Sequence, residues 1–163
     1  MLYRLIRTRD DAALAAIRIA LGVVMFAHGS QKMLGWFGGY GFNGTMGFFE
    51  SQLHIPAPLA VLAIVAEFFG GIGLVLGLLG RVAALGIAVN MVVAIVTVHL
   101  PNGFFMNWSG QQKGEGFEYH FLVLAITAAV MLHGSGALSV DYAISRGSAH
   151  WVPGGAAHLP SHG

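Results

Sequence analysis

Charged side chains lie within segments of this chain that are otherwise strongly apolar. Glu67 stands alone in the apolar run 59–79, and Arg18 interrupts the run 12–27. An ionised side chain near the centre of a bilayer costs roughly 3 kcal/mol even on the mildest scales. Each of these residues therefore needs a partner or a function.

We expect Arg18 and Glu67 to pair with each other across two neighbouring helices. Gly22 and Gly29 follow Arg18 on the same helical face, and two small residues there let a second helix approach closely. The pair has two interpretations, which stay open at this point. It is a structural ion pair that holds two helices in register, or it has a functional role. If Arg18 pairs elsewhere, a desolvated Glu67 is expected to exchange protons near neutral pH.

A second polar group is expected at the opposite end of the same segments. It comprises His28, Lys32, His99, Glu118 and His120, with Trp108 in a nearby loop. Histidines on facing helices suit a b-type haem, whereas histidines beside an apolar cleft suit the carbonyl oxygens of a quinone. We favour the quinone over the haem and assign no metal ligand. The candidate catalytic residues are Glu67, His28 and His120; the candidate cofactor-binding residues are Arg18, Lys32, Trp108 and Glu118.

The composition indicates which elements position these side chains. Of 163 residues, 56% are hydrophobic and only 9% are charged, which is too little polar surface for a soluble domain of this size. Four segments approach the length of about 20 residues that a membrane span requires, and the fourth is the weakest. The expected spans are residues 12–33, 57–79, 81–100 and 117–138. The predicted fold is an all-α, integral membrane four-helix bundle, with one domain over residues 1–146 and a flexible tail over 147–163.

The basic residues predict the orientation of the bundle. Lys and Arg beside the spans gather mainly on the side that holds Arg4, Arg7, Arg9 and Arg81, so both termini are expected in the cytoplasm. Between the first two spans, Met46, Phe49 and Leu53 share one helical face and predict a short interfacial helix. The connection at 80–81 is so short that the second and third spans must be antiparallel neighbours.

Charge and cysteine content exclude several functions. The net charge is +1 and no basic stripe exists, so we expect no nucleic-acid partner. The chain has no cysteine, which excludes thiol nucleophiles, dithiol relays and iron–sulfur ligation by this chain alone. An oxidation would therefore need a partner that carries electrons.

Four short motifs resemble the DoxX family of small four-helix bacterial membrane proteins. They are HGSQK at 28–32, AEFFGG at 66–71, GLLGR at 77–81 and LSVD at 138–141. The resemblance covers about residues 12–145, and it carries over Arg18, His28, Lys32, Glu67 and Asp141 as motif positions. From the residues themselves, Asp141 beyond the fourth span is expected to cap a turn or short helix. Some members of the family are linked to quinone-coupled oxidation, which implies a location in the bacterial inner membrane.

Two functions are consistent with these features. The resemblance implies a membrane subunit of a quinone-linked oxidoreductase system, with the lipid bilayer and either other protein subunits or further copies of the chain as partners. The alternative is a non-catalytic structural or assembly subunit that anchors a larger membrane complex. In neither case do we expect a complete enzyme.

Overall fold

The structure, a computed structural model, describes residues 2–149, and all regular elements within this range are helices. The all-α fold class is therefore confirmed. The longer elements are α1 (Leu2–Ile6), α2 (Ala12–Leu34), α3 (Gly41–Ser51), α4 (Ala57–Leu76), α5 (Gly80–Ala94), α6 (Glu118–His133) and α7 (Val140–Ala149). Short turns complete the list: η1 (Trp36–Gly38), the π-helical η2 (Ile95–His99) and η3 (Leu100–Asn102). Of the predicted tail, residues 150–163 lie outside the described residues.

Within residues 2–149, three helices are long and apolar enough to cross a membrane. They are α2 with 23 residues, α4 with 20 residues, and the continuous helical stretch Gly80–Asn102 with 23 residues. The fourth apolar helix, α6, has 16 residues and is about 24 Å long at 1.5 Å per residue. It is thus shorter than a hydrocarbon core about 30 Å thick.

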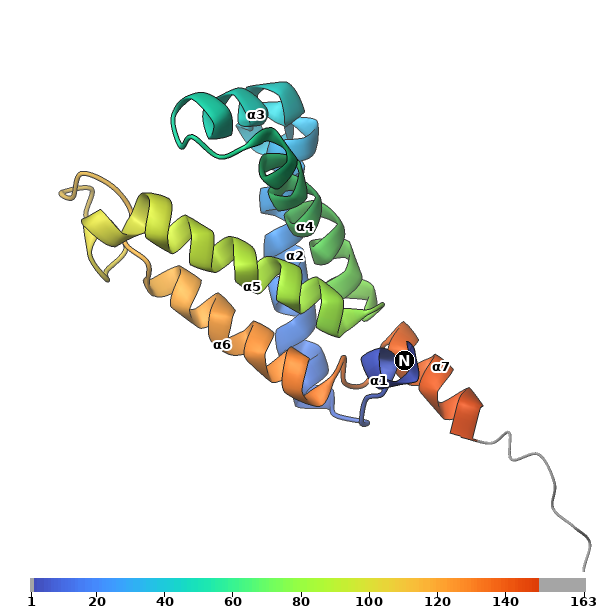
Figure 1. Cartoon of the computed structure of the whole chain (residues 1–163). Coiled ribbons are helices and arrows are strands. Elements are labelled where there is room, and N and C mark those ends of the chain that lie inside the picture. Colours follow the sequence, from blue (N-terminus) through green and yellow to red (C-terminus); the bar gives the residue numbers. More distant parts are fainter. Residues whose placement is uncertain (1, 150–163) are drawn as a thin grey trace, which may run out of the picture.

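The helices pack as two pairs that contact each other (Figure 1). Helix α2 lies against α4, and α5 lies against α6, while α4 also packs on α5. Toward the end that carries α3 and the 103–117 loop the two pairs diverge, and α1 and α7 lie together at the other end. The short helix expected between the first two spans is present as α3.

Glycines bring α2 and α4 into backbone contact. A Cβ atom at Gly29 would lie 2.5 Å from the backbone nitrogen of Phe68, and one at Gly22 would lie 2.7 Å from that of Val75. A Cβ at Gly71 would likewise lie 2.5 Å from the backbone nitrogen of Phe26. The predicted close approach of a second helix to the glycine face of α2 is confirmed.

The predicted Arg18–Glu67 ion pair is wrong. Arg18 is fully buried, and its guanidinium donates hydrogen bonds only to backbone carbonyls. The acceptors are the carbonyl oxygens of Leu74, Val75, Ser135, Ala137 and Leu138. The antiparallel register places the last turn of α4 opposite Arg18, about two turns beyond Glu67, and carbonyls at a helix end lack intrahelical donors. The five N–H donors of the Arg18 guanidinium therefore find backbone carbonyls that can accept their hydrogen bonds.

Asp141 caps the turn between α4 and α5. Its Oδ1 accepts from the Leu79 amide at 2.9 Å, and its Oδ2 accepts from the Gly80 amide at 3.0 Å and from the Ser135 hydroxyl at 2.6 Å. Leu79 has a left-handed backbone with φ of 50°. The capping role expected for Asp141 is confirmed, and it helps to hold the 135–138 loop that Arg18 contacts.

Candidate functional site

A cavity of about 460 Å³ lies where the two helix pairs diverge, and it is lined by α2, α3, α4, α5, α6 and the segments that join them. Its apolar wall includes Met25, Phe48, Phe49, Leu53, Ile55 and Met91. Its polar residues are His28, Lys32, Glu67, Asn90, Thr97, His99, Glu115, Tyr119 and His120. A largely apolar cavity with a few convergent polar groups is typical of a small-molecule site.

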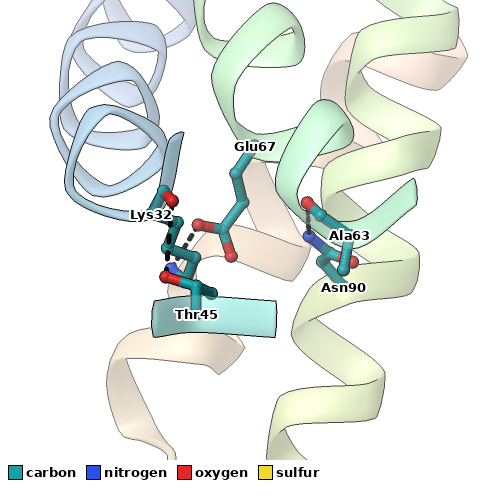
Figure 2. Close-up of polar contacts among 5 residues, drawn as sticks. All are labelled: Lys32, Thr45, Ala63, Glu67 and Asn90. Carbon is teal, nitrogen blue, oxygen red and sulfur yellow. Dashed lines mark hydrogen bonds and ion pairs between the residues drawn. The ribbon is translucent and has the colours of Figure 1, made fainter. Parts of the chain in front are cut away.

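An ion pair between Lys32 and Glu67 joins α2 to α4 at this cavity (Figure 2). The Lys32 ammonium donates to Glu67 Oε2, and the two side chains are 27% and 10% exposed. Glu67 Oε1 has no hydrogen-bond partner among the described residues, so this oxygen is available to a proton or a ligand. The ammonium of Lys32 supplies the partner that a carboxylate at membrane depth needs.

Two further hydrogen bonds fix the helices around the ion pair, as Figure 2 also shows. The Thr45 hydroxyl donates to the Lys32 carbonyl at 3.3 Å, which ties α3 to the end of α2. The Asn90 side-chain amide donates to the Ala63 carbonyl at 2.7 Å, one turn before Glu67 on α4. These contacts and the ion pair therefore join four helices, α2, α3, α4 and α5, around the Glu67 carboxylate.

Aromatic and imidazole rings line the cavity on the α6 side. The ring centroids of His99 and His120 are 4.1 Å apart, those of Tyr119 and His120 are 5.4 Å apart, and those of His28 and Tyr119 are 6.1 Å apart. His99 Nδ1 lies 2.8 Å from the Glu115 carbonyl oxygen. Since a carbonyl only accepts, Nδ1 carries the proton, and in a neutral ring Nε2 is then an acceptor. His99 occupies the π-helical turn at the end of α5.

Two buried polar atoms at the cavity lack hydrogen-bond partners among residues 2–149. They are Nδ1 of His120, a side chain only 7% exposed, and the hydroxyl of Tyr119. A buried donor or acceptor left unpaired costs about 1–3 kcal/mol, so such groups usually meet water or a ligand. The Tyr119 hydroxyl offers a donor and His120 Nδ1 offers a donor or an acceptor, depending on its tautomer.

The structure brings together most, but not all, of the residues selected from the sequence. His28, Lys32, Glu67 and His120 line the cavity together with His99. Arg18, Trp108 and Glu118 are not among its lining residues. Instead, the Trp108 indole donates to Glu118 Oε1 at 2.9 Å, and Trp108 is 87% exposed. Glu118 is two residues from His120 on one helix, so the two side chains project in nearly opposite directions.

Sequence reasoning assigned no role in the site to Asn90, Thr97, Glu115 or Tyr119, all of which line the cavity. Asn90 and Thr97 are polar residues inside an apolar run, and this position could have indicated that they belong to the site. Tyr119 precedes His120 at the start of α6 and gave no signal of its own. Glu115 lies in a loop, where an acidic residue is ordinary.

His99 and His120 fit the two axial positions of one haem poorly. Two axial ligands must lie on opposite faces of the porphyrin, whereas the rings of His99 and His120 are in contact, at 4.1 Å between centroids. Within the described part of the chain, no group of three or more His, Asp or Glu side chains is placed to hold a metal ion. The donors instead suit hydrogen bonds to the oxygens of a small organic molecule.

The helices define a multi-pass α-helical membrane protein with a cavity among its spans. The DoxX family model matches residues 13–100, and the chain belongs to the DoxX family. A Bacillus subtilis (strain 168) protein named "Putative oxidoreductase CatD" is 28% identical over 131 residues, which cover 80% of this chain and 86% of that protein. No solved structure gives a significant match to the chain.

Proposed function

We propose that this protein is a membrane subunit of a quinone-linked oxidoreductase system and that its cavity holds the quinone head group. The observation that carries the proposal is the pair of unpartnered buried groups, Tyr119 Oη and His120 Nδ1, at a cavity with a largely apolar wall. The name of the B. subtilis relative, an oxidoreductase, agrees with this reaction class.

The cavity residues can each be given a part in this reaction. The Tyr119 hydroxyl and the His120 imidazole donate hydrogen bonds to a quinone carbonyl, and Lys32 keeps Glu67 in place through their ion pair. Reduction of a quinone to a quinol takes up two electrons and two protons. Glu67, His28 and His120 are the proton-exchanging groups, because carboxylate and imidazole side chains transfer protons near neutral pH.

The electrons must come from a partner subunit that carries a redox cofactor. The chain contains no cysteine, so it offers neither a dithiol nor a thiolate-bound cluster. The protein is accordingly proposed as the quinone-binding part of a complex rather than as a complete enzyme. In this proposal Arg18, Trp108 and Glu118 do not contact the quinone.

Quinone retention and turnover test the proposal. The complex is purified from native membranes with its partners, its quinone is extracted and quantified by mass spectrometry, and its quinone reductase rate is measured. We expect Tyr119→Phe to lower quinone affinity about two- to tenfold, the value of one hydrogen bond. Glu67→Gln should lower the rate about 10²-fold or more, since it removes a proton-exchanging group.

Glu118→Gln is the matched control for Glu67→Gln, because Glu118 carries the same charge but bonds Trp108 instead of lining the cavity. It should leave both the rate and the quinone content unchanged. A native complex without quinone, or equal rates in the two glutamine variants, contradicts the proposal.

The second candidate function is a structural or assembly subunit. Large aromatic side chains stand exposed at the end of the molecule that holds the cavity: Phe37 at 71%, Tyr40 at 85%, Phe105 at 68% and Trp108 at 87%. Exposed aromatic residues are typical of protein interfaces and of the membrane interface. Reduced assembly of the host complex with an unchanged rate per assembled complex in Glu67→Gln would favour this function.

The same proposal includes the topology of the chain. Arg7 and Arg81 lie at the end of the bundle opposite the cavity, and the positive-inside rule places that end in the cytoplasm. Helix α6 packs along α5, which belongs to the spanning stretch Gly80–Asn102, and this packing supports the proposal of a fourth crossing. We therefore propose a location in the bacterial inner membrane, with both termini cytoplasmic and a single membrane domain over residues 1–146.

A further inference from the structure

A second cavity, of about 170 Å³, lies at the other end of the helices, where the segment after α1, the start of α5 and the end of α6 meet. It is lined by Arg7, Thr8, Arg9, Arg81, Leu132 and His133. It shares no lining residue with the larger cavity. Its ligand is therefore a separate question from that of the quinone.

The lining of this basic pocket combines three arginines with a histidine and holds no carboxylate. Within the described part of the chain the one ion pair joins Lys32 and Glu67, so no carboxylate pairs with these arginines. The acids nearest in the sequence are already engaged: Asp11 Oδ1 accepts from the Leu14 amide at 2.9 Å, and Asp10 Oδ2 accepts from the Tyr142 hydroxyl at 2.9 Å. Among the described residues, the arginines of the pocket thus form no ion pair with a carboxylate.

Arg81 is held rigidly at the wall of the pocket. Its guanidinium donates to four backbone carbonyls, those of Leu5, Arg7, Met131 and Leu132, at 3.2, 2.5, 2.9 and 3.5 Å. These carbonyls fix the side chain but leave its charge in place, because they are neutral. The Thr8 hydroxyl accepts from the Gly136 amide at 2.7 Å, so its own proton remains free to be donated.

We propose that the basic pocket binds a phosphate group, and that in the membrane this group is the head-group phosphate of an anionic phospholipid. Arginines recognise phosphate oxygens through charge-assisted hydrogen bonds, and basic pockets at the cytoplasmic face of membrane helices bind anionic lipids. Leu132, in the same lining, is 75% exposed and offers an apolar contact for an acyl chain. Arg7 and Arg9 are exposed beside it and reach the phosphate from the N-terminal segment.

The full chain in detergent, titrated with short-chain phosphatidylglycerol and with phosphatidylcholine, tests the proposal, with bound lipid counted by native mass spectrometry. We expect phosphatidylglycerol to bind more tightly than phosphatidylcholine. The double substitution Arg7→Gln with Arg9→Gln should weaken phosphatidylglycerol about 25-fold, that is, about fivefold for each arginine near an anionic lipid. Inorganic phosphate is titrated in parallel.

The matched control is the double substitution Arg4→Gln with Arg146→Gln. It removes the same charge at the same end of the molecule, yet neither residue lines the pocket. The control should bind phosphatidylglycerol almost as well as the unmodified chain. Equal losses in the two double variants, or no loss in Arg7→Gln with Arg9→Gln, overturn the proposal, because attraction would then be diffuse or absent.

The phosphate titration distinguishes the source of the group. If phosphatidylglycerol binds and inorganic phosphate does not compete at millimolar concentration, the ligand is a lipid. If inorganic phosphate binds equally well and the Arg7→Gln with Arg9→Gln variant weakens both, the pocket recognises phosphate from solution. If neither binds, no phosphate site exists there.

Discussion

Arg18 and Glu67 are both charged residues inside apolar helices, yet their surroundings differ sharply. Arg18 is fully buried, and every hydrogen bond it makes is to a backbone carbonyl. Glu67 lies at a cavity, with one carboxylate oxygen bound to Lys32 and the other unbound within the described residues. The hydrogen bonds of Arg18 therefore join helix ends and a loop, whereas Glu67 lines the cavity in which we propose a reaction.

Substitution of Arg18 should destabilise the protein strongly. Arg18→Gln leaves several buried carbonyls without a donor, and the loss of a buried polar network of this kind costs about 3–5 kcal/mol. Thermal unfolding of the purified protein in detergent, followed by circular dichroism, measures the effect. Arg4→Gln is the control, because Arg4 is exposed. An unfolding temperature for Arg18→Gln equal to that of the control would mean that the carbonyl network contributes little.

At the scale of elements, the contact between α2 and α4 positions both polar groups. Because Gly22, Gly29 and Gly71 let the two backbones touch, Lys32 at the end of α2 reaches Glu67 near the middle of α4. The same register brings the last turn of α4 to Arg18. One helix contact thus sets the cavity at one end and the carbonyl network at the other.

A methyl group at this contact should separate the helices. A Cβ at Gly29 would lie 2.5 Å from the Cα and the backbone nitrogen of Phe68, and backbone atoms cannot move aside cheaply. We expect Gly29→Ala to destabilise the protein by about 1–3 kcal/mol, as overpacking does, and to weaken quinone binding. The unfolding midpoint and the quinone content of the purified protein report these effects.

Gly47→Ala is the control for this substitution. Gly47 lies within helix α3, and a Cβ there would meet no atom within 4 Å. Alanine is a better helix former than glycine by about 1 kcal/mol, so this variant should be as stable as the unmodified protein or slightly more so. If Gly29→Ala behaves in the same way, the two helices are not held at backbone contact.

For the whole molecule, the absence of cysteine makes the topology directly testable, since any introduced thiol is unique. We expect Lys113→Cys, in the loop before α6, to react with a membrane-impermeant maleimide in intact cells. Arg4→Cys should react only after permeabilisation, because the proposed topology places the basic end in the cytoplasm. If Arg4→Cys reacts in intact cells and Lys113→Cys reacts only after permeabilisation, the orientation is the opposite of the proposed one. If both sites react in intact cells, both lie outside the cell. The segment between them would then cross the membrane an even number of times, in contradiction to the proposed topology.

The sequence by itself determined the class of protein and its helices. The predicted spans 12–33 and 57–79 begin with α2 and α4, because long apolar runs can satisfy their backbone only as helices in a membrane. The glycine face of α2, the short helix α3 and the capping role of Asp141 were also predictable. The glycine face and the short helix depend on the spacing of residues within a short stretch of sequence. The cap depends on a side chain with few other hydrogen-bond partners nearby.

Only the tertiary structure decided which polar groups meet. Lys32 replaced Arg18 as the partner of Glu67, and Arg18 contacts the 135–138 loop, more than a hundred residues away in the chain. Tyr119 lines the cavity, whereas Glu118 does not line it and accepts a hydrogen bond from Trp108. These outcomes depend on the register and rotation of packed helices. A shift of one turn moves a side chain by about 5.4 Å, which no pattern of hydropathy resolves.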